Sequence, residues 1–330
     1  MPSEDSMHPV KLSLAAAAAL LIAAAAAAGA AEYPVKPVRI VIGFPPGGAS
    51  DILVRFIGSR LAEGLGQAIV YDNRPGAGGN IAGEIVAKSP PDGYTLLMGN
   101  NAILATNVSL YRKIGFDPLR DFAPVALLAT QPNILVVHPS LPVKSVKELI
   151  AFARARPGQL NYASSGSGLA AHLAGELFKV MTRTDLVHVP YKGAGPALLD
   201  TLTGQCQVMF ATAVSVQPHL KSGRLRALAV TTAARSKNFP QLPTVAEAGV
   251  PGFEASTWHG IVAPAGTPQP VIARLNGEIN KVLQLPDTRE RLAAQGADAG
   301  GGTPQQFGDF IRAEIPKWAK VIEASGARVD

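Results

Sequence analysis

Short apolar runs alternate with stretches of helical periodicity along most of the chain. Residues 38–44 form a mostly β-branched run, which is typical of a strand buried on both faces. Residues 51–65 carry apolar side chains at helical spacing, and residues 69–71 are predicted to form the next strand. This order predicts an α/β fold with a mostly parallel sheet and helices on both of its faces.

The same alternation continues to the end of the chain. Ser145 followed by Glu148 has the spacing of a capping box and predicts a helix start. Further strands are predicted at 96–98, 134–138, 160–163, 186–189, 208–212, 226–231 and 260–263. Further helices are predicted at 81–88, 145–155, 169–181, 196–202, 271–283 and 304–324.

Two strand–helix units followed by a returning chain predict two lobes. We expect residues 32–130 to begin lobe 1, residues 131–231 to form lobe 2, and residues 232–330 to return to lobe 1. The chain would then cross between lobes near 125–133 and 228–233. Ligands of open α/β sheets bind beyond the carboxyl ends of the strands, so a cleft between the lobes is the expected site.

Residues 1–31 have the features of a signal peptide. Lys11 precedes an Ala- and Leu-rich segment at 12–28, and Ala28-Gly29-Ala30 offers small residues for cleavage. A membrane anchor is the alternative, but Ala is barely hydrophobic enough to hold a spanning helix, and Pro34 and Pro37 end any helix soon after this segment. No later segment is long and apolar enough to span a membrane. Export to the periplasm is therefore expected.

The residue composition excludes several classes of function. The chain has 30 Lys and Arg against 24 Asp and Glu, and its basic residues are scattered, which predicts a solvated surface and not a nucleic-acid site. Cys206 is the single cysteine, so no intrachain disulfide can form. The histidines do not cluster, and the phosphate-loop and serine-elbow motifs are missing. We expect no enzyme activity, no metal and no cofactor.

Two glycine- and serine-rich turns carry the candidate chemistry. Residues 44–51 and 162–168 each lie between a predicted strand and a predicted helix. Backbone N–H groups at a helix N-terminus suit an anion, although an ordinary turn capped by Ser50 or Asp51 would have the same pattern. The second turn begins like a dinucleotide-binding motif. No acidic residue follows at the end of the next strand, so its serines are predicted to bind a small anion instead.

Other residues at strand ends complete the predicted site. Asn101 and Thr212 follow the strands at 96–98 and 208–211, and His172 lies one turn into the helix after the second turn. Each of them could equally have a structural role in its own segment. The predicted ligand-binding residues are Phe44, Gly47, Gly48, Ser50, Asp51, Asn101, Ser164, Gly166, Ser167, Gly168, His172 and Thr212.

Six phrases occur in the order found in one transport family: FPPGG at 44–48, PDGYTLL at 91–97, HVPYKG at 188–193, RALAV at 226–230, PTVAEAG at 243–249 and APAGTP at 263–268. The mature chain thus resembles the substrate-binding proteins of tripartite tricarboxylate transporters, the Bug family. This resemblance implies a two-lobe type II periplasmic-binding-protein fold that closes on its ligand. It also implies that a carboxylate lies between residues 47–51 and 164–168. Gln205-Cys206-Gln207 departs from the family pattern and leaves the ligand's identity open.

The leading hypothesis is a monomeric periplasmic receptor that captures a small carboxylate and delivers it to a membrane permease. The carboxylate could be a di- or tricarboxylate, an amino acid or an aromatic acid. One alternative is an extracytoplasmic sensor that passes the ligand signal to a membrane partner. Another is a secreted α/β hydrolase, which would need a histidine within hydrogen-bond reach of Ser164, Ser167 or Cys206.

Overall fold

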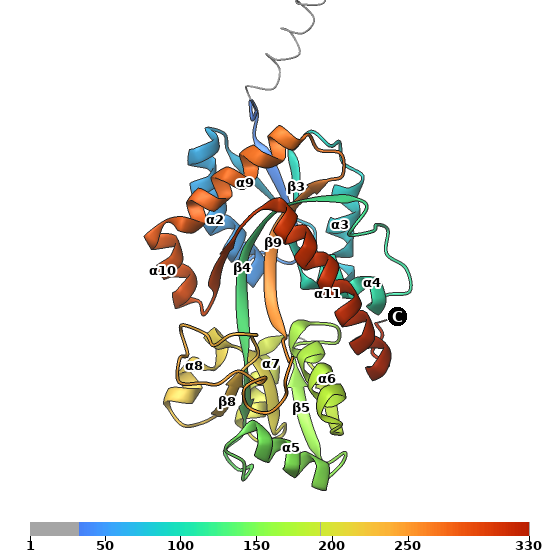
Figure 1. The fold of residues 1–330 in the computed structure, drawn as a ribbon, viewed down its shortest axis with the longest axis vertical. Coiled ribbons are helices and arrows are strands. Elements are labelled where there is room, and N and C mark those ends of the chain that lie inside the picture. Colours follow the sequence, from blue (N-terminus) through green and yellow to red (C-terminus); the bar gives the residue numbers. More distant parts are fainter. Residues whose placement is uncertain (1–32, 192, 330) are drawn as a thin grey trace, which may run out of the picture.

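Two long antiparallel strands connect the two lobes of the molecule (Figure 1). β4 (Phe122–Val137) and β9 (Ser256–Pro264) pair from Phe122 opposite Pro264 to Pro132 opposite Ser256. The computed structural model describes residues 33–191 and 193–329, and the predicted signal peptide at 1–31 lies outside them. Within the described residues, no helix combines the length and apolarity needed to cross a membrane.

Lobe 1 is built on the sheet order β2–β1–β3–β9–β4, with β10 on the other side of β4. β1 is parallel to β2 and β3, as the apolar runs predicted, whereas β9 and β10 pair antiparallel. The sheet is therefore mixed where a mostly parallel one was predicted, because the long strands β4 and β9 run antiparallel to their neighbours. Its remaining strands are β1 (Val38–Ile42), β2 (Ile69–Asn73), β3 (Thr95–Asn100) and β10 (Asp298–Gly301). Its helices include α2 (Ala49–Leu65), α3 (Asn80–Ala87), α9 (Gln269–Gln284) and α10 (Pro286–Ala294).

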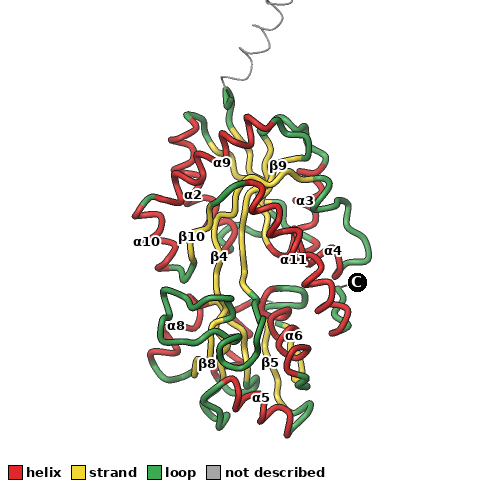
Figure 2. Tube along the Cα trace, in the orientation of Figure 1, coloured by secondary structure: helices red, strands yellow, loops and turns green. Residues whose placement is uncertain are grey.

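Lobe 2 uses the far half of β4, so the two sheets share one strand, as the yellow strands of Figure 2 show. β7 and β8 pair antiparallel with β4, while β5 lies parallel between β6 and β7. The strands are β5 (Leu160–Ser164), β6 (Leu186–Pro190), β7 (Val208–Thr212) and β8 (Arg226–Val230). The helices are α5 (Val146–Ala155), α6 (Ala170–Thr182), α7 (Ala194–Leu202) and α8 (Ala213–Lys221).

The C-terminal helix α11 (Pro304–Ser325) links the lobes a third time. It begins with a complete capping box between Thr303 and Gln306, and it packs on β4, on α4 (Asn107–Leu110) and on α6 of lobe 2. Figure 1 shows it crossing from lobe 1 toward α6 on the side of the molecule opposite α10. Just before α4, residues Ala102–Thr106 form a short π-helix. Another short element, Ala77–Gly79, is a 3₁₀-helix.

The predicted strands and helices are found within a few residues of their expected bounds, except that one strand is much longer and several elements were not predicted. The strand predicted at 134–138 is the end of the 16-residue β4. Its first half, which contains Pro124 and Pro132, was predicted only as a crossing between the lobes near 125–133. Shifts in the register of β4 against β9 near Pro124 accommodate the missing N–H. Helices α8 and α10, the helical segment at 102–110 and strand β10 were not predicted.

The return to lobe 1 also comes later than the expected boundary at residue 231. The Ala255 N–H donates to the Thr231 carbonyl at 2.9 Å, and Phe253 packs against Phe178 and Phe210 of lobe 2. Residues 232–255 therefore lie on lobe 2, and the second crossing is β9. Residues 238–245 are rich in proline, but this segment leads into the buried Val245 and Val250.

Candidate functional site

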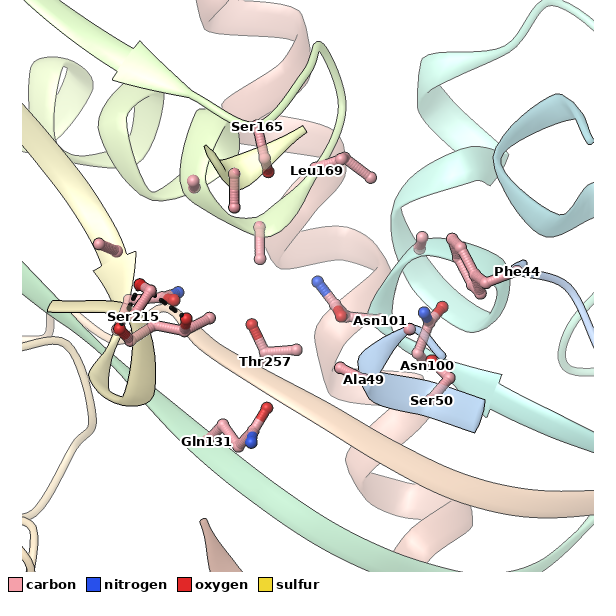
Figure 3. A pocket seen from close by; sticks show the side chains of 18 of the residues that line it. Phe44, Ala49, Ser50, Asn100, Asn101, Gln131, Ser165, Leu169, Ser215 and Thr257 are labelled. Atoms are coloured by element: carbon pink, nitrogen blue, oxygen red, sulfur yellow. Dashed lines mark hydrogen bonds between the residues drawn. The ribbon is translucent and has the colours of Figure 1, made fainter. Parts of the chain in front are cut away.

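A cavity of about 300 Å³ lies between the lobes, where the two turns approach each other (Figure 3). Lobe 1 contributes the first turn and the end of β3, lobe 2 contributes the second turn and the end of β7, and the crossing strands form the floor. The lining residues are Phe44, Pro45, Gly48, Ala49, Ser50, Asn100, Asn101, Ala102, Gln131, Asn133, Ser165, Leu169, Ala170, Ala171, Ala194, Met209, Phe210, Ala211, Thr212, Ser215, Thr257 and His259.

The floor of the cavity is polar but uncharged. Gln131 and Asn133 are two positions apart on β4, and Thr257 and His259 are two positions apart on β9. Successive side chains of a strand point to opposite faces, so the two members of each pair lie on the same face. Gln131 is directly opposite Thr257 in the ladder. None of these four residues was predicted. The available signal was a polar residue at every second position of an otherwise apolar strand.

Helices α2, α6, α7 and α8 begin at the cavity without a side-chain cap. Their N-cap residues are Gly48, Leu169, Gly193 and Thr212, and none accepts a capping hydrogen bond. The first N–H groups of an α-helix have no intrahelical partner, and they carry partial positive charge. No Lys, Arg, Asp or Glu is among the described residues that line the cavity. The site therefore favours an anion through helix ends and neutral donors.

Asp51 fixes the first turn from behind. Its carboxylate accepts the Gly47 N–H at 2.9 Å, the Asn73 amide at 3.0 Å and the Arg55 guanidinium at 2.8 Å. Burial raises the pKa of Asp51, but these hydrogen bonds outweigh it and hold the pKa below its ordinary value. The expected capping role is therefore wrong: Asp51 binds the turn and not the helix end. The other expected cap, Ser50, has its hydroxyl 3.0 Å from His259 Nε2.

Two stacked histidines support the second turn. His172 and His188 have ring centroids 4.0 Å apart. The Gly168 N–H donates to His172 Nδ1 at 2.9 Å, and Ser164 Oγ lies 2.7 Å from His188 Nε2. The Gly166 N–H in turn donates to Ser164 Oγ at 3.2 Å. The two histidines and Ser164 thus hold the turn in place. Ser165, and not Ser164, lines the cavity.

The predicted site residues divide into two groups. Those that line the cavity are Phe44, Gly48, Ser50, Asn101 and Thr212. Those that are not part of its lining are Gly47, Asp51, Ser164, Gly166, Ser167, Gly168 and His172. Ser164 is the last residue of β5 and is fully buried, so its side chain points to His188 and the next residue reaches the cleft. Ligand contact by any member of this set stays a prediction.

The Ser164–His188 pair meets the distance criterion set for a hydrolase but not its chemistry. Ser164 is fully buried, so no substrate reaches its hydroxyl. Among the described residues, the His188 side chain hydrogen-bonds only to Ser164, through Nε2. No carboxylate within this part of the chain accepts a hydrogen bond from His188 Nδ1, as a catalytic histidine would require. Cys206 is buried too, 3.5 Å from the Tyr191 hydroxyl. The pair is structural.

Buried histidines predict a loss of stability in mild acid. Burial lowers the pKa of His259 to about 4, and burial with the nearby Lys179 charge lowers that of His172 to about 4. Unfolded histidine has a pKa of about 6.5, so below that pH the unfolded chain binds protons that the folded protein excludes. Stability is thus complete above about pH 6.5 and falls toward about pH 4, by at most about 1.4 kcal/mol per pH unit for each histidine.

Urea unfolding at about pH 7.5 and about pH 5 measures this difference. The free energy of unfolding should be lower at the acidic pH, and the His259→Asn variant should show a smaller drop. Equal stability at both pH values would contradict the prediction.

Comparison with known proteins gives a consistent result. A family model described as "Tripartite tricarboxylate transporter family receptor" matches residues 53–327. Protein BugT of Bordetella pertussis is 42% identical over 301 residues, which cover 91% of this chain and 92% of BugT. A UPF0065 protein from the tcbD–tcbE intergenic region of Pseudomonas sp. strain P51 is 41% identical over 291 residues, 88% of this chain and 86% of that protein.

Solved structures share both fold and sequence with the chain. Rpa4515 of R. palustris, solved with adipate, has a TM-score of 0.77 and 44% identity, covering 89% of this chain and 98% of its own. MatC (Rpa3494) from Rhodopseudomonas palustris, solved with bound malate, has a TM-score of 0.74 and 34% identity, covering 88% of this chain and 100% of its own. The similarity therefore extends over both lobes and the cleft.

Proposed function

Because the chain belongs to the family of tripartite tricarboxylate transporter receptors, we propose that its inter-lobe cavity captures a small carboxylate in the periplasm and delivers it to the permease of such a transporter. Like its relatives, the protein is a carboxylate-binding receptor and not an enzyme. The predicted two-lobe periplasmic binding fold is confirmed. Export would depend on residues 1–31, which lie outside the described part of the chain.

The main support for this proposal is the set of uncapped helix N-termini at the cavity. Lobe 1 presents the start of α2, and lobe 2 presents the starts of α6 and α8 to the same cavity. A carboxylate between them would accept N–H groups from both lobes. Closure of residues 133–255 against the rest of the chain would then be favoured only when the ligand is present.

The adipate and malate found in two related structures support a dicarboxylate as the ligand. Malate and adipate have four- and six-carbon chains, so the relatives differ in chain length. In Figure 3 the hydroxyl of Ser165 and the amides of Asn101 and Gln131 surround the centre of the cavity. Neutral donors of this kind hold a carboxylate directly or through bridging water.

Isothermal titration calorimetry with the mature protein tests the proposal. The panel contains succinate, malate, adipate and citrate, with glucose as the neutral control. We expect at least one acid to bind and glucose not to bind. If no acid binds, whether or not glucose does, the proposed function is overturned.

A further inference from the structure

The inter-lobe cavity continues into a second space, which we call the outer branch. The outer branch has a volume of about 410 Å³ and shares Ala49, Gln131, Thr212, Ser215 and His259 with the inner cavity. Beyond these shared residues, its walls are Ile52, Leu53, Gln295 and Ala297. The two spaces are therefore parts of one elongated cleft.

The walls of the outer branch are largely apolar. Ile52 is 44% exposed, whereas its neighbour Leu53 on α2 is 6% exposed. An exposed isoleucine that borders a cavity gains free energy when an apolar group covers it. No charged side chain is among the described residues that line this branch. The outer branch thus suits hydrocarbon better than a second charged group.

The cleft is closed on the side away from the outer branch. A Cβ atom on Gly168 of the second turn would lie 2.1 Å from a methyl group of Leu110, so these segments are in direct contact. The Val329 N–H reaches the Leu110 carbonyl at 3.4 Å, and α11 packs on α6. Figure 1 shows α4, α6 and α11 together on this side, with α10 on the other. A ligand held at the helix ends can therefore extend along the outer branch, toward Gln295 and Ala297 at the end of α10.

We propose that the outer branch binds the apolar body of the ligand, so that the receptor prefers carboxylic acids with a chain or ring of six or more carbons over four-carbon acids. This inference rests on the proposed function, because it assumes that a carboxylate occupies the inner cavity. The carboxylate stays at the helix ends, and the chain or ring beyond it lies along Ile52, Leu53 and Ala297. A linear chain and an aromatic ring share this apolar chemistry.

Calorimetry with paired acids separates these cases. One arm compares butyrate, hexanoate and octanoate, and the other compares propionate with 3-phenylpropionate. Each methylene that becomes fully buried raises affinity about fourfold. Octanoate should therefore bind tenfold or more tightly than butyrate, or 3-phenylpropionate than propionate, and the arm that responds identifies the chain or the ring.

The Ile52→Ser variant tests whether the gain comes from the outer branch. It should lower the affinity for the longer acid of the responding arm several-fold more than for the shorter one. Ile81→Ser is the matched control, because Ile81 is 45% exposed on α3 and does not line the cleft. It should leave both affinities unchanged. If butyrate binds as tightly as octanoate and the phenyl group adds nothing, the inference is wrong. If no acid binds at all, the proposed function itself fails.

Discussion

The Ala170→Asp variant is expected to lose carboxylate binding almost completely while it stays folded. Ala170 is the first residue of α6 and lines the inner cavity. A carboxylate there would lie about 4 Å from the ligand's carboxylate, which costs about 4 kcal/mol at an effective dielectric constant near 20. The dissociation constant should rise roughly a thousandfold. Calorimetry with the best ligand of the wild-type protein measures the change.

Folding of this variant should not suffer, because an acidic residue in the first turn of a helix stabilises it by about 0.3–1 kcal/mol. A thermal melt checks that point. Ala170→Asn is the matched control, since it adds nearly the same volume without the charge. Its dissociation constant should rise far less. Equal losses in both variants would mean that shape and not charge excludes the ligand, and the electrostatic account of the site would be wrong.

The Glu314→Leu variant should have the largest effect on stability. Glu314 Oε2 accepts the indole N–H of Trp258 at 3.0 Å and that of Trp318 at 2.9 Å, and Glu314 Oε1 pairs with Lys317 at 2.6 Å. Both indoles are almost fully buried. Leucine leaves two buried donors without a partner, and loss of one member of a buried charged group costs about 3–5 kcal/mol. Urea unfolding should show this loss.

Tryptophan fluorescence reports on this cluster directly, because Trp258 and Trp318 are the chain's two tryptophans. Glu314→Gln is the control, since its amide oxygen can still accept an indole N–H. It should lose clearly less stability than Glu314→Leu. A change below about 1 kcal/mol in the leucine variant would show that the indoles find other partners.

Local patterns in the sequence predicted the elements and the two turns well. The apolar run at 38–44 and the periodicity of 51–65 depend on neighbouring residues, and both elements are found. The predicted cap at Ser145 is confirmed, because Ser145 Oγ accepts the Glu148 N–H at 3.2 Å. The Glu148 carboxylate, however, accepts the backbone N–H of Lys144 at 2.8 Å and not that of Ser145, so the predicted capping box is only half formed. Family phrases spread over the chain likewise identified the receptor class.

Residues that meet only in the folded protein could not be predicted in this way. His259 reaches Ser50 although 209 positions separate them, and Gln131 lies opposite Thr257 only because β4 and β9 pair. The choice of Ser165 over Ser164 at the cavity depends on His188, which arrives from another strand.

By itself, the sequence determined the alternation of strands and helices, the position of the two turns and the class of receptor. The elements and turns depend on backbone preferences and side-chain periodicity within short segments, whereas the class of receptor came from the resemblance of six phrases to one family. The tertiary structure alone decided the polar floor, the outer branch and the closed side formed by α11. Each of these arises from side chains of distant segments that are brought together by long-range packing, which no local pattern encodes.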